Sequence, residues 1–137
     1  MIKDSKSAES LAKILSEALP YIQKFSGKIV VIKYGGSAMK ENKLRQNFAR
    51  DIALMRQIGI FPVLVHGGGP QIERNLKKNN IKSVFIDGLR KTDENSIKTI
   101  VKTLREVNGD ISELIKTWGA RTKTFNDVRE SILCLLY

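Results

Sequence analysis

Two glycine loops, each placed directly after a run of aliphatic residues, constrain the fold of this chain more than any other feature. Neither run, at residues 28–32 and 63–65, alternates with polar residues, and such runs are typical of central parallel strands covered on both faces. Ligands of parallel sheets bind at the carboxyl ends of the strands. The loops at those ends read Lys33-Tyr34-Gly35-Gly36 and His66-Gly67-Gly68-Gly69-Pro70.

The loops favour a phosphate site. Glycine lets the backbone approach an anion closely, and the start of a following helix offers unpaired N–H groups and a partial positive charge. Pro70 suits the first position of that helix. A tight strand-to-helix turn remains the alternative for either loop alone, whereas the two loops together favour function.

Two familiar phosphate-binding motifs are excluded by the letters. A P-loop would need Gly-Lys-Ser/Thr, but Gly27-Lys28 is followed by Ile29. A dinucleotide fingerprint that began at Gly67 would need glycine where Ile72 stands. Neither a Walker sequence nor a Rossmann site is expected.

Length and composition predict one domain without membrane or nucleic-acid partners. A chain of 137 residues is close to the common domain size. It is 42% hydrophobic without a run long enough to span a membrane and without a signal pattern, so we expect a soluble, cytoplasmic protein. The net charge of +10 is spread among acidic residues rather than clustered, which favours a solvated surface over a nucleic-acid footprint. A basic enzyme would also attract acidic substrates.

Helical periodicity predicts several helices between the strands. An amphipathic helix over 7–25, capped by Ser7, contains Pro20 and should kink near residues 17–19. A helix over 43–58, ended by Gly59, turns the two aliphatic runs into a parallel crossover unit. A third helix should cover 70–79.

The remaining sequence predicts a short strand and two helices. The strand covers 83–86 and ends in Asp87-Gly88-Leu89-Arg90, and Thr92, Asp93 and Glu94 read as a cap with an acidic first turn. Apolar spacing predicts one helix through 97–107 and a successor through 111–118, ended by Gly119. The expected fold is α/β, a three-layer α/β/α sandwich with a mainly parallel central sheet, preceded by a kinked N-terminal helix.

The quoted motifs, together with residues 17–25, 48–51 and 87–93, resemble the amino-acid kinase superfamily and, within it, the N-acetylglutamate kinases of arginine biosynthesis. Lys-x-Gly-Gly is shared across the superfamily, whereas His-Gly-Gly-Gly-Pro-Gln followed by Asp-Gly-Leu-Arg is much more specific to the acetylglutamate branch. The resemblance implies an amino-acid kinase fold with a helical extension at 1–27 and an acetylglutamate-binding N-terminal lobe at 28–120.

The resemblance also implies the chemistry. ATP would phosphorylate the side-chain carboxylate of N-acetyl-L-glutamate to an acyl phosphate, with Mg²⁺ but no metal ligands from this chain. By resemblance Lys33 is the transition-state stabiliser, and Arg90 holds a substrate carboxylate with its planar fork. Phosphate or ATP contacts would come from Lys33, Gly35, Gly36 and Gly67, and substrate contacts from Gly68, Gly69 and Arg90.

Simpler interpretations stand beside these roles. Lys33 could be an exposed strand-end lysine, and Arg90 could form a surface ion pair with Asp87 or Asp93. His66 is more typical of a hydrogen-bonded structural group than of a catalytic triad.

The N-terminal helix resembles the extension of arginine-inhibited family members. It would make a homo-oligomer, a dimer or a hexamer built through that helix, and it would place Tyr21 near a feedback site for L-arginine.

The resemblance ends after Gly119, where the family continues into a second lobe that carries the nucleotide pocket. Residues 121–137 form an atypical tail, and the C-terminal nucleotide lobe is expected to be absent. Three functions therefore remain: an acetylglutamate kinase, complete or truncated; a related kinase for another carboxylate; or a catalytically inactive binding or assembly module.

Overall fold

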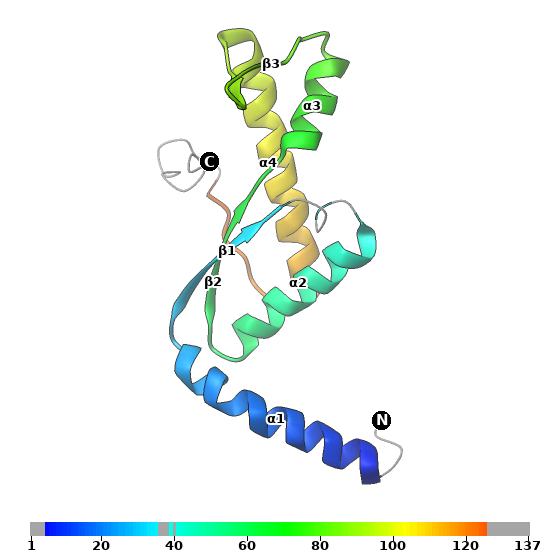
Figure 1. Cartoon of the computed structure of the whole chain (residues 1–137), viewed down its shortest axis with the longest axis vertical. Helices are drawn as coiled ribbons and strands as arrows, with labels where there is room; N and C mark the ends of the chain where they lie inside the picture. Colours follow the sequence, from blue (N-terminus) through cyan, green and yellow to red (C-terminus); the bar gives the residue numbers. More distant parts are fainter. Residues whose placement is uncertain (1–4, 36–38, 40, 126–137) are drawn as a thin grey trace.

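The computed structural model describes residues 5–35, 39 and 41–125. Figure 1 shows the chain order of its helices and strands. The elements are α1 (Ser5–Phe25), β1 (Ile29–Tyr34), α2 (Asn42–Gln57), β2 (Phe61–His66), α3 (Gly69–Lys78), β3 (Val84–Ile86), β4 (Leu89–Lys91) and α4 (Glu94–Lys116).

Strands β1 and β2 form the parallel pair predicted from the aliphatic runs. Their register runs from Ile29↔Phe61 to Tyr34↔His66, and α2 is the crossover between them. The turn from α2 into β2 needs Gly59, because its φ of 88° lies in the left-handed region that glycine adopts readily. The α/β class and the parallel pairing are confirmed.

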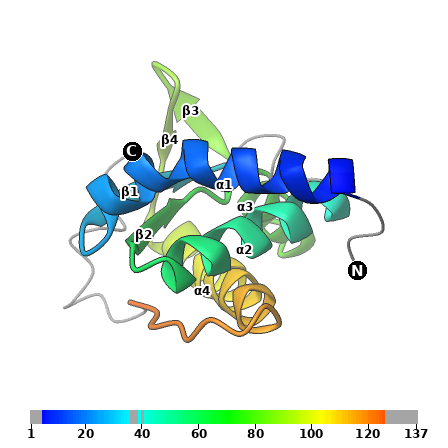
Figure 2. The same ribbon diagram turned by 90° about the horizontal axis from the view of Figure 1, so that it is seen from below.

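Helices α2 and α4 lie together on one side of the two strands, as Figures 1 and 2 both show. On the other face of β1, Ile29 is 72% and Val31 is 63% exposed. Within the described residues the pair is therefore covered on one face. The aliphatic runs suit burial on both faces, but β1 alternates between exposed and half-buried positions.

Helix α4 connects two hydrophobic clusters that together form the core. Its C-terminal half contributes Ile115 to the cluster around Ala49 and Ile52 of α2. Its N-terminal half contributes Ile100 to the cluster with Ile72 and Leu76 of α3. Figure 1 shows α4 running from the β3–β4 end of the molecule to α2. This helix therefore holds α3 in place relative to the parallel strands.

The prediction of two helices after Asp93 is wrong, because α4 is continuous from Glu94 to Lys116. Gly109 lies inside it. An interior glycine costs a helix only about 1 kcal/mol relative to alanine, and Val107 and Ile115 are buried on either side of it. Packing of the same helix face on both sides of Gly109 outweighs its preference for a break.

A second strand, β4, follows the predicted short strand and was not predicted. It pairs antiparallel with β3, from Val84↔Lys91 to Ile86↔Leu89. Asp87 and Gly88 both have positive φ, 49° and 79°, as a two-residue hairpin turn requires. The hairpin carries Arg90 on its second strand.

Helix α1 begins at Ser5, so Ser7 lies inside it rather than capping it, and the helix continues through Pro20 to Phe25. The kink near residues 17–19 stays a prediction. Figure 1 shows α1 leading away from the rest of the molecule, and Leu11, Leu15 and Leu19 are exposed along it. Among the helices described, none is both long and apolar enough to cross a membrane.

Candidate functional site

The carboxyl ends of β1 and β2 lie side by side. Lys33 is in register with Val65 and Tyr34 with His66, and the Gly67 N–H donates to the Tyr34 carbonyl over 3.1 Å. The structure therefore brings Lys33 and Gly35 to the same edge as the loop from Gly67 to Gly69. Gly36 lies outside the described residues.

Tyr34 fixes the end of β1. Its ring stacks on Phe48 of α2, with centroids 3.8 Å apart and planes 5° from parallel, and it is only 4% exposed. Burial raises the pKa of the Tyr34 hydroxyl, and the charge of Arg45 opposes part of that rise. A neutral, packed tyrosine thus anchors the residue beside Lys33, whose own side chain points away from the core and is exposed.

The start of α3 carries no side-chain cap. Gly68 is the N-cap residue, and its carbonyl accepts the Ile72 N–H at 2.8 Å. Unpaired N–H groups at a helix start attract anions. The N-terminal end of α3, where the glycine loop meets the helix, can therefore bind an anionic group.

Packing explains one of the four described loop glycines. A Cβ on Gly68 would lie 2.8 Å from Cδ2 of Leu104, whereas a Cβ on Gly35, Gly67 or Gly69 would meet nothing within 4 Å. The folded chain itself leaves space beside these three positions. Close approach of a ligand to the backbone is a physical reason for glycine there.

His66 makes a local hydrogen bond. Its Nδ1 lies 2.9 Å from the Gly67 carbonyl, so the protonated nitrogen donates to that oxygen. This contact supports the interpretation of His66 as a structural group that holds the glycine loop.

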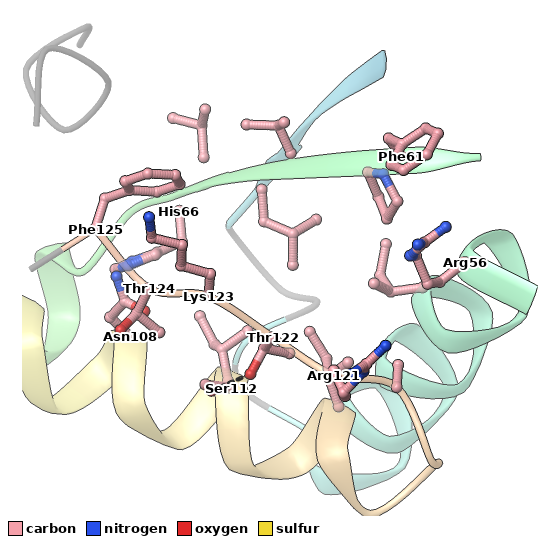
Figure 3. A pocket seen from close by; sticks show the side chains of 18 of the residues that line it. Arg56, Phe61, His66, Asn108, Ser112, Arg121, Thr122, Lys123, Thr124 and Phe125 are labelled. Carbon is pink, nitrogen blue, oxygen red and sulfur yellow. Dashed lines mark hydrogen bonds between the residues drawn. The ribbon is translucent and has the colours of Figure 1, made fainter. Parts of the chain in front are cut away.

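A cavity of about 590 Å³ lies beside β2 but does not contain the predicted site residues. Figure 3 shows His66, Asn108 and Phe125 on its wall. Ser112 and Thr122 within it bond each other at 2.6 Å. Lys33, the glycine loop and Arg90 are not among its lining residues, so the cavity and the strand-end site are different places.

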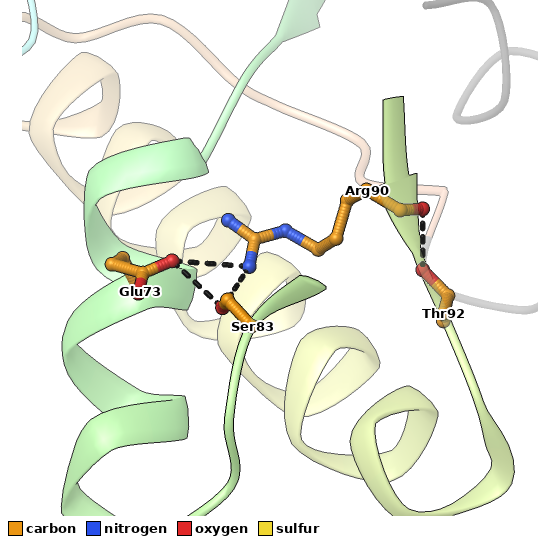
Figure 4. A network of polar contacts seen from close by, with 4 residues as sticks. All are labelled: Glu73, Ser83, Arg90 and Thr92. Atoms are coloured by element: carbon orange, nitrogen blue, oxygen red, sulfur yellow. Dashed lines mark hydrogen bonds and ion pairs between the residues drawn. The ribbon is translucent and has the colours of Figure 1, made fainter. Parts of the chain in front are cut away.

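Arg90 is held by partners that the sequence did not indicate. Figure 4 shows its Nη1 bonded to Glu73 of α3 and to the Ser83 hydroxyl, and the distance to Glu73 Oε2 is 3.1 Å. The guanidinium also lies 4.6 Å from the centroid of the Phe85 ring. An ion pair with Asp87 or Asp93 was the simpler alternative, and the observed partner is Glu73 instead.

Glu73 is charged in this arrangement. The Ser83 hydroxyl donates to its Oε2 at 2.8 Å, and that bond, followed by the bond from Arg90, lowers the pKa of the Glu73 carboxyl. Glu73 lies one helical turn beyond Gly69, on the same side of α3. The amphipathic pattern of α3 does not identify Glu73 as the partner of Arg90, because the two residues are 17 positions apart in the sequence.

Tyr21 is placed elsewhere. It lies near the end of α1 with its ring exposed, and α1 extends away from the glycine loop (Figure 1). The structure therefore does not bring Tyr21 into this site.

The described residues do not form a metal cage of their own. Across 5–35, 39 and 41–125 there is no group of three or more His, Cys, Asp or Glu side chains arranged to hold a metal ion. Mg²⁺ in phosphoryl-transfer sites is commonly held through substrate phosphates, one or two carboxylates and water. Residues of this region do not by themselves fit a resident Mg²⁺, and we assign it no step.

A profile of the amino acid kinase family matches residues 28–127. The chain is also 53% identical over 109 residues to the acetylglutamate kinase of Aquifex aeolicus (strain VF5), covering 79% of this chain and 37% of that protein. It is 52% identical over 120 residues to the acetylglutamate kinase of Stutzerimonas stutzeri (strain A1501), covering 87% and 40%. The chain thus spans well under half the length of these relatives.

Two solved structures of another enzyme also align with this chain. N-acetylglutamate synthase from Neisseria gonorrhoeae, complexed with coenzyme A and N-acetyl-glutamate, aligns with a TM-score of 0.58 and 28% identity over 76% of this chain and 23% of that chain. The same enzyme complexed with coenzyme A and L-arginine aligns with a TM-score of 0.58 and 27% identity, over 80% and 25%.

Proposed function

This chain belongs to the amino acid kinase family, and from that premise we propose that it serves an acetylglutamate kinase reaction of arginine biosynthesis. In that reaction a side-chain carboxylate oxygen of N-acetyl-L-glutamate attacks the γ-phosphorus of ATP. The bond from that phosphorus to the bridging oxygen breaks, and the products are an acyl phosphate and ADP. The relatives named acetylglutamate kinase support this choice of substrate.

One observation carries the proposal: the parallel register of β1 and β2 puts Lys33 beside the glycine loop. Phosphoryl transfer depends mainly on positioning and on neutralising charge on the moving phosphoryl group. We assign the ammonium group of Lys33 to that task, with Gly35, Gly36 and Gly67 as phosphate contacts.

The acceptor is assigned to the other side of the site. Gly68 and Gly69 would contact N-acetyl-L-glutamate at the start of α3, and Arg90 would bind one of its carboxylates. A guanidinium matches a carboxylate bidentately, which a lysine does not. This division gives each cation one anion, Lys33 the phosphoryl group and Arg90 the acceptor.

The remaining parts of the proposal concern the whole protein. ATP would be the co-substrate and Mg²⁺ its companion ion, in the cytoplasm. The chain would divide into a helical extension at 1–27, an acetylglutamate-binding lobe at 28–120 and a tail at 121–137. The exposed apolar residues of α1 support a role for that helix in a homo-oligomer, a dimer or a hexamer. By the family resemblance, Tyr21 would lie near a site for L-arginine.

The test is ATP-dependent acyl phosphate formation by the purified chain with N-acetyl-L-glutamate, trapped as the hydroxamate, alongside calorimetric binding of N-acetyl-L-glutamate. Turnover that Lys33→Ala abolishes and Lys28→Ala leaves intact supports the proposal, because Lys28 precedes the opposite end of the same strand. Binding without turnover supports the acceptor half alone.

Two outcomes would favour other functions. Turnover with a different carboxylate, but not with N-acetyl-L-glutamate, would assign the chain to a related kinase. The absence of both binding and turnover would overturn the proposal. A stable complex with a full-length kinase would then identify an assembly module.

A further inference from the structure

We propose that Glu73 and Ser83 are positioning residues that hold Arg90 as an open fork for a carboxylate of the acceptor substrate. This inference rests on the proposed function, because it concerns the same acceptor. The network of the three residues is visible in Figure 4.

The hydrogen bonds to Arg90 use one nitrogen and leave the others available. Both Glu73 and Ser83 contact Nη1. Among the residues that the structure describes, no hydrogen bond is found at Nε or Nη2 of Arg90. A carboxylate binds side-on to that pair of nitrogens, and two parallel N–H bonds are the strong, directional form of arginine recognition.

Further contacts restrict how Arg90 can move. The Phe85 ring lies 4.6 Å from its guanidinium. Ser83 bonds both Arg90 and Glu73, which closes a triangle around Nη1. As a result the Arg90 side chain is only 17% exposed, although it lies on a short hairpin. Fixing a long side chain before a ligand arrives reduces the conformational entropy lost on binding.

The position of Glu73 explains why this fork would serve the glycine loop. Side chains three and four residues apart share one face of a helix. Glu73 therefore lies on the same face of α3 as Gly69, one turn further from the start of the helix. By pairing with Glu73, Arg90 crosses from β4 to α3, one helical turn beyond Gly69. A substrate carboxylate bound there would meet Arg90 and the loop together.

Whether removal of the Glu73 carboxylate strengthens or weakens substrate binding is informative, because Glu73 carries the same charge as the substrate carboxylate. If Glu73 only repelled the substrate or occupied Arg90, its removal would strengthen binding. If it positions Arg90, its removal weakens binding. Its side chain is 54% exposed, and exposed ion pairs change an equilibrium by about two- to fivefold.

The experiment measures N-acetyl-L-glutamate binding to the full chain by calorimetry, for the wild type, Glu73→Gln and Glu113→Gln. Glu113 forms an exposed ion pair with Lys116 on α4 and provides a matched loss of one paired carboxylate. We expect Glu73→Gln to weaken binding about two- to fivefold and Glu113→Gln to leave it unchanged. In an Arg90→Lys background, Glu73→Gln should have no further effect, because the two residues act through one contact.

Equal or tighter binding by Glu73→Gln overturns the inference. If the wild type binds no N-acetyl-L-glutamate, the proposed function fails, and the positioning role is decided by NMR of the free chain. Glu73→Gln, but not Glu113→Gln, should then shift and broaden the Arg90 Nε–H resonance. An unchanged resonance would overturn the positioning role as well.

Discussion

The start of α3 and the start of α4 solve the same physical problem in opposite ways. Each helix leaves N–H groups without helical partners. At α4 the Ser96 N–H donates to the Asp93 carboxylate at 2.8 Å, and the Asp93 N–H donates to the Ser96 hydroxyl at 3.0 Å. At α3 the N-cap is Gly68, which has no side chain to offer.

The difference separates a helix start that supports the fold from one that is available for a ligand. The reciprocal bonds at α4 satisfy the N–H groups of Asp93 and Ser96 from within the chain, and they place a carboxylate where an anion would otherwise bind. The start of α3 keeps that capacity. It follows β2, whose end pairs with the end of β1, and Arg90 bonds Glu73 one helical turn further along α3. If the start of α3 is available for a ligand and the start of α4 serves stability, substitutions near the two helix starts should affect different properties.

Removal of the Lys33 charge should have the largest effect. In a chain that shows the proposed turnover, Lys33→Ala should lower kcat by roughly two to three orders of magnitude, as other losses of transition-state charge stabilisation do. The hydroxamate assay measures it, with Lys28→Ala as control. Unchanged turnover would remove Lys33 from the mechanism and leave the open end of α3 without its cation.

Arg90→Lys should act mainly on substrate binding. The variant keeps the charge but loses the planar fork, so we expect KM for N-acetyl-L-glutamate to rise roughly tenfold while kcat changes little. Initial-rate kinetics measure the split, and Arg50→Lys is the control because Arg50 pairs with Asp51 on the exposed side of α2. A change confined to kcat would contradict the role.

Two glycines of the same loop should respond differently. Gly68→Ala forces Leu104 to move and should cost about 1 kcal/mol of unfolding free energy, the low end for overpacking, because the atom it meets is the end of a flexible side chain. Gly67→Ala meets nothing within 4 Å and should leave stability unchanged while it weakens binding of a phosphate ligand. Urea unfolding and calorimetry separate the two. Equal destabilisation by both changes would show that packing explains both glycines.

Much of this comparison could be predicted from the sequence, because its signals are local. The aliphatic runs and glycine loops predicted β1, β2 and the start of α3, and Thr92-Asp93-Glu94 predicted the capped start of α4. In the structure Asp93 is the N-cap and Glu94 is the acidic residue of the first turn.

Other features depend on contacts between distant segments. The sequence predicted two helices, through 97–107 and through 111–118, whereas the packing that keeps α4 continuous across Gly109 comes from α2 and α3. The Asp87-Gly88 pair is a good hairpin signal, but three-residue strands are too short to show alternation. Glu73 could not be identified as the partner of Arg90, since the fold alone brings α3 and β4 together.

The cap at α4 should contribute a small, pH-dependent part of the stability. The bonds from the Ser96 side chain and then its backbone N–H lower the pKa of Asp93. A carboxyl group whose pKa is lowered in the folded state stabilises the fold at pH values above its unfolded pKa of about 3.9, and this stabilisation disappears as the pH falls through the folded pKa.

Asparagine also caps a helix but does not titrate. The urea midpoint of wild type should therefore exceed that of Asp93→Asn near neutral pH, and the gap should close below about pH 4. Asp110→Asn, on the exposed face of α4, is the control. A gap that stays constant between pH 7 and pH 3 (roughly the range in which carboxyl groups titrate) would show that the charge of Asp93 does not hold the start of α4, and the contrast with α3 would then rest on α3 alone.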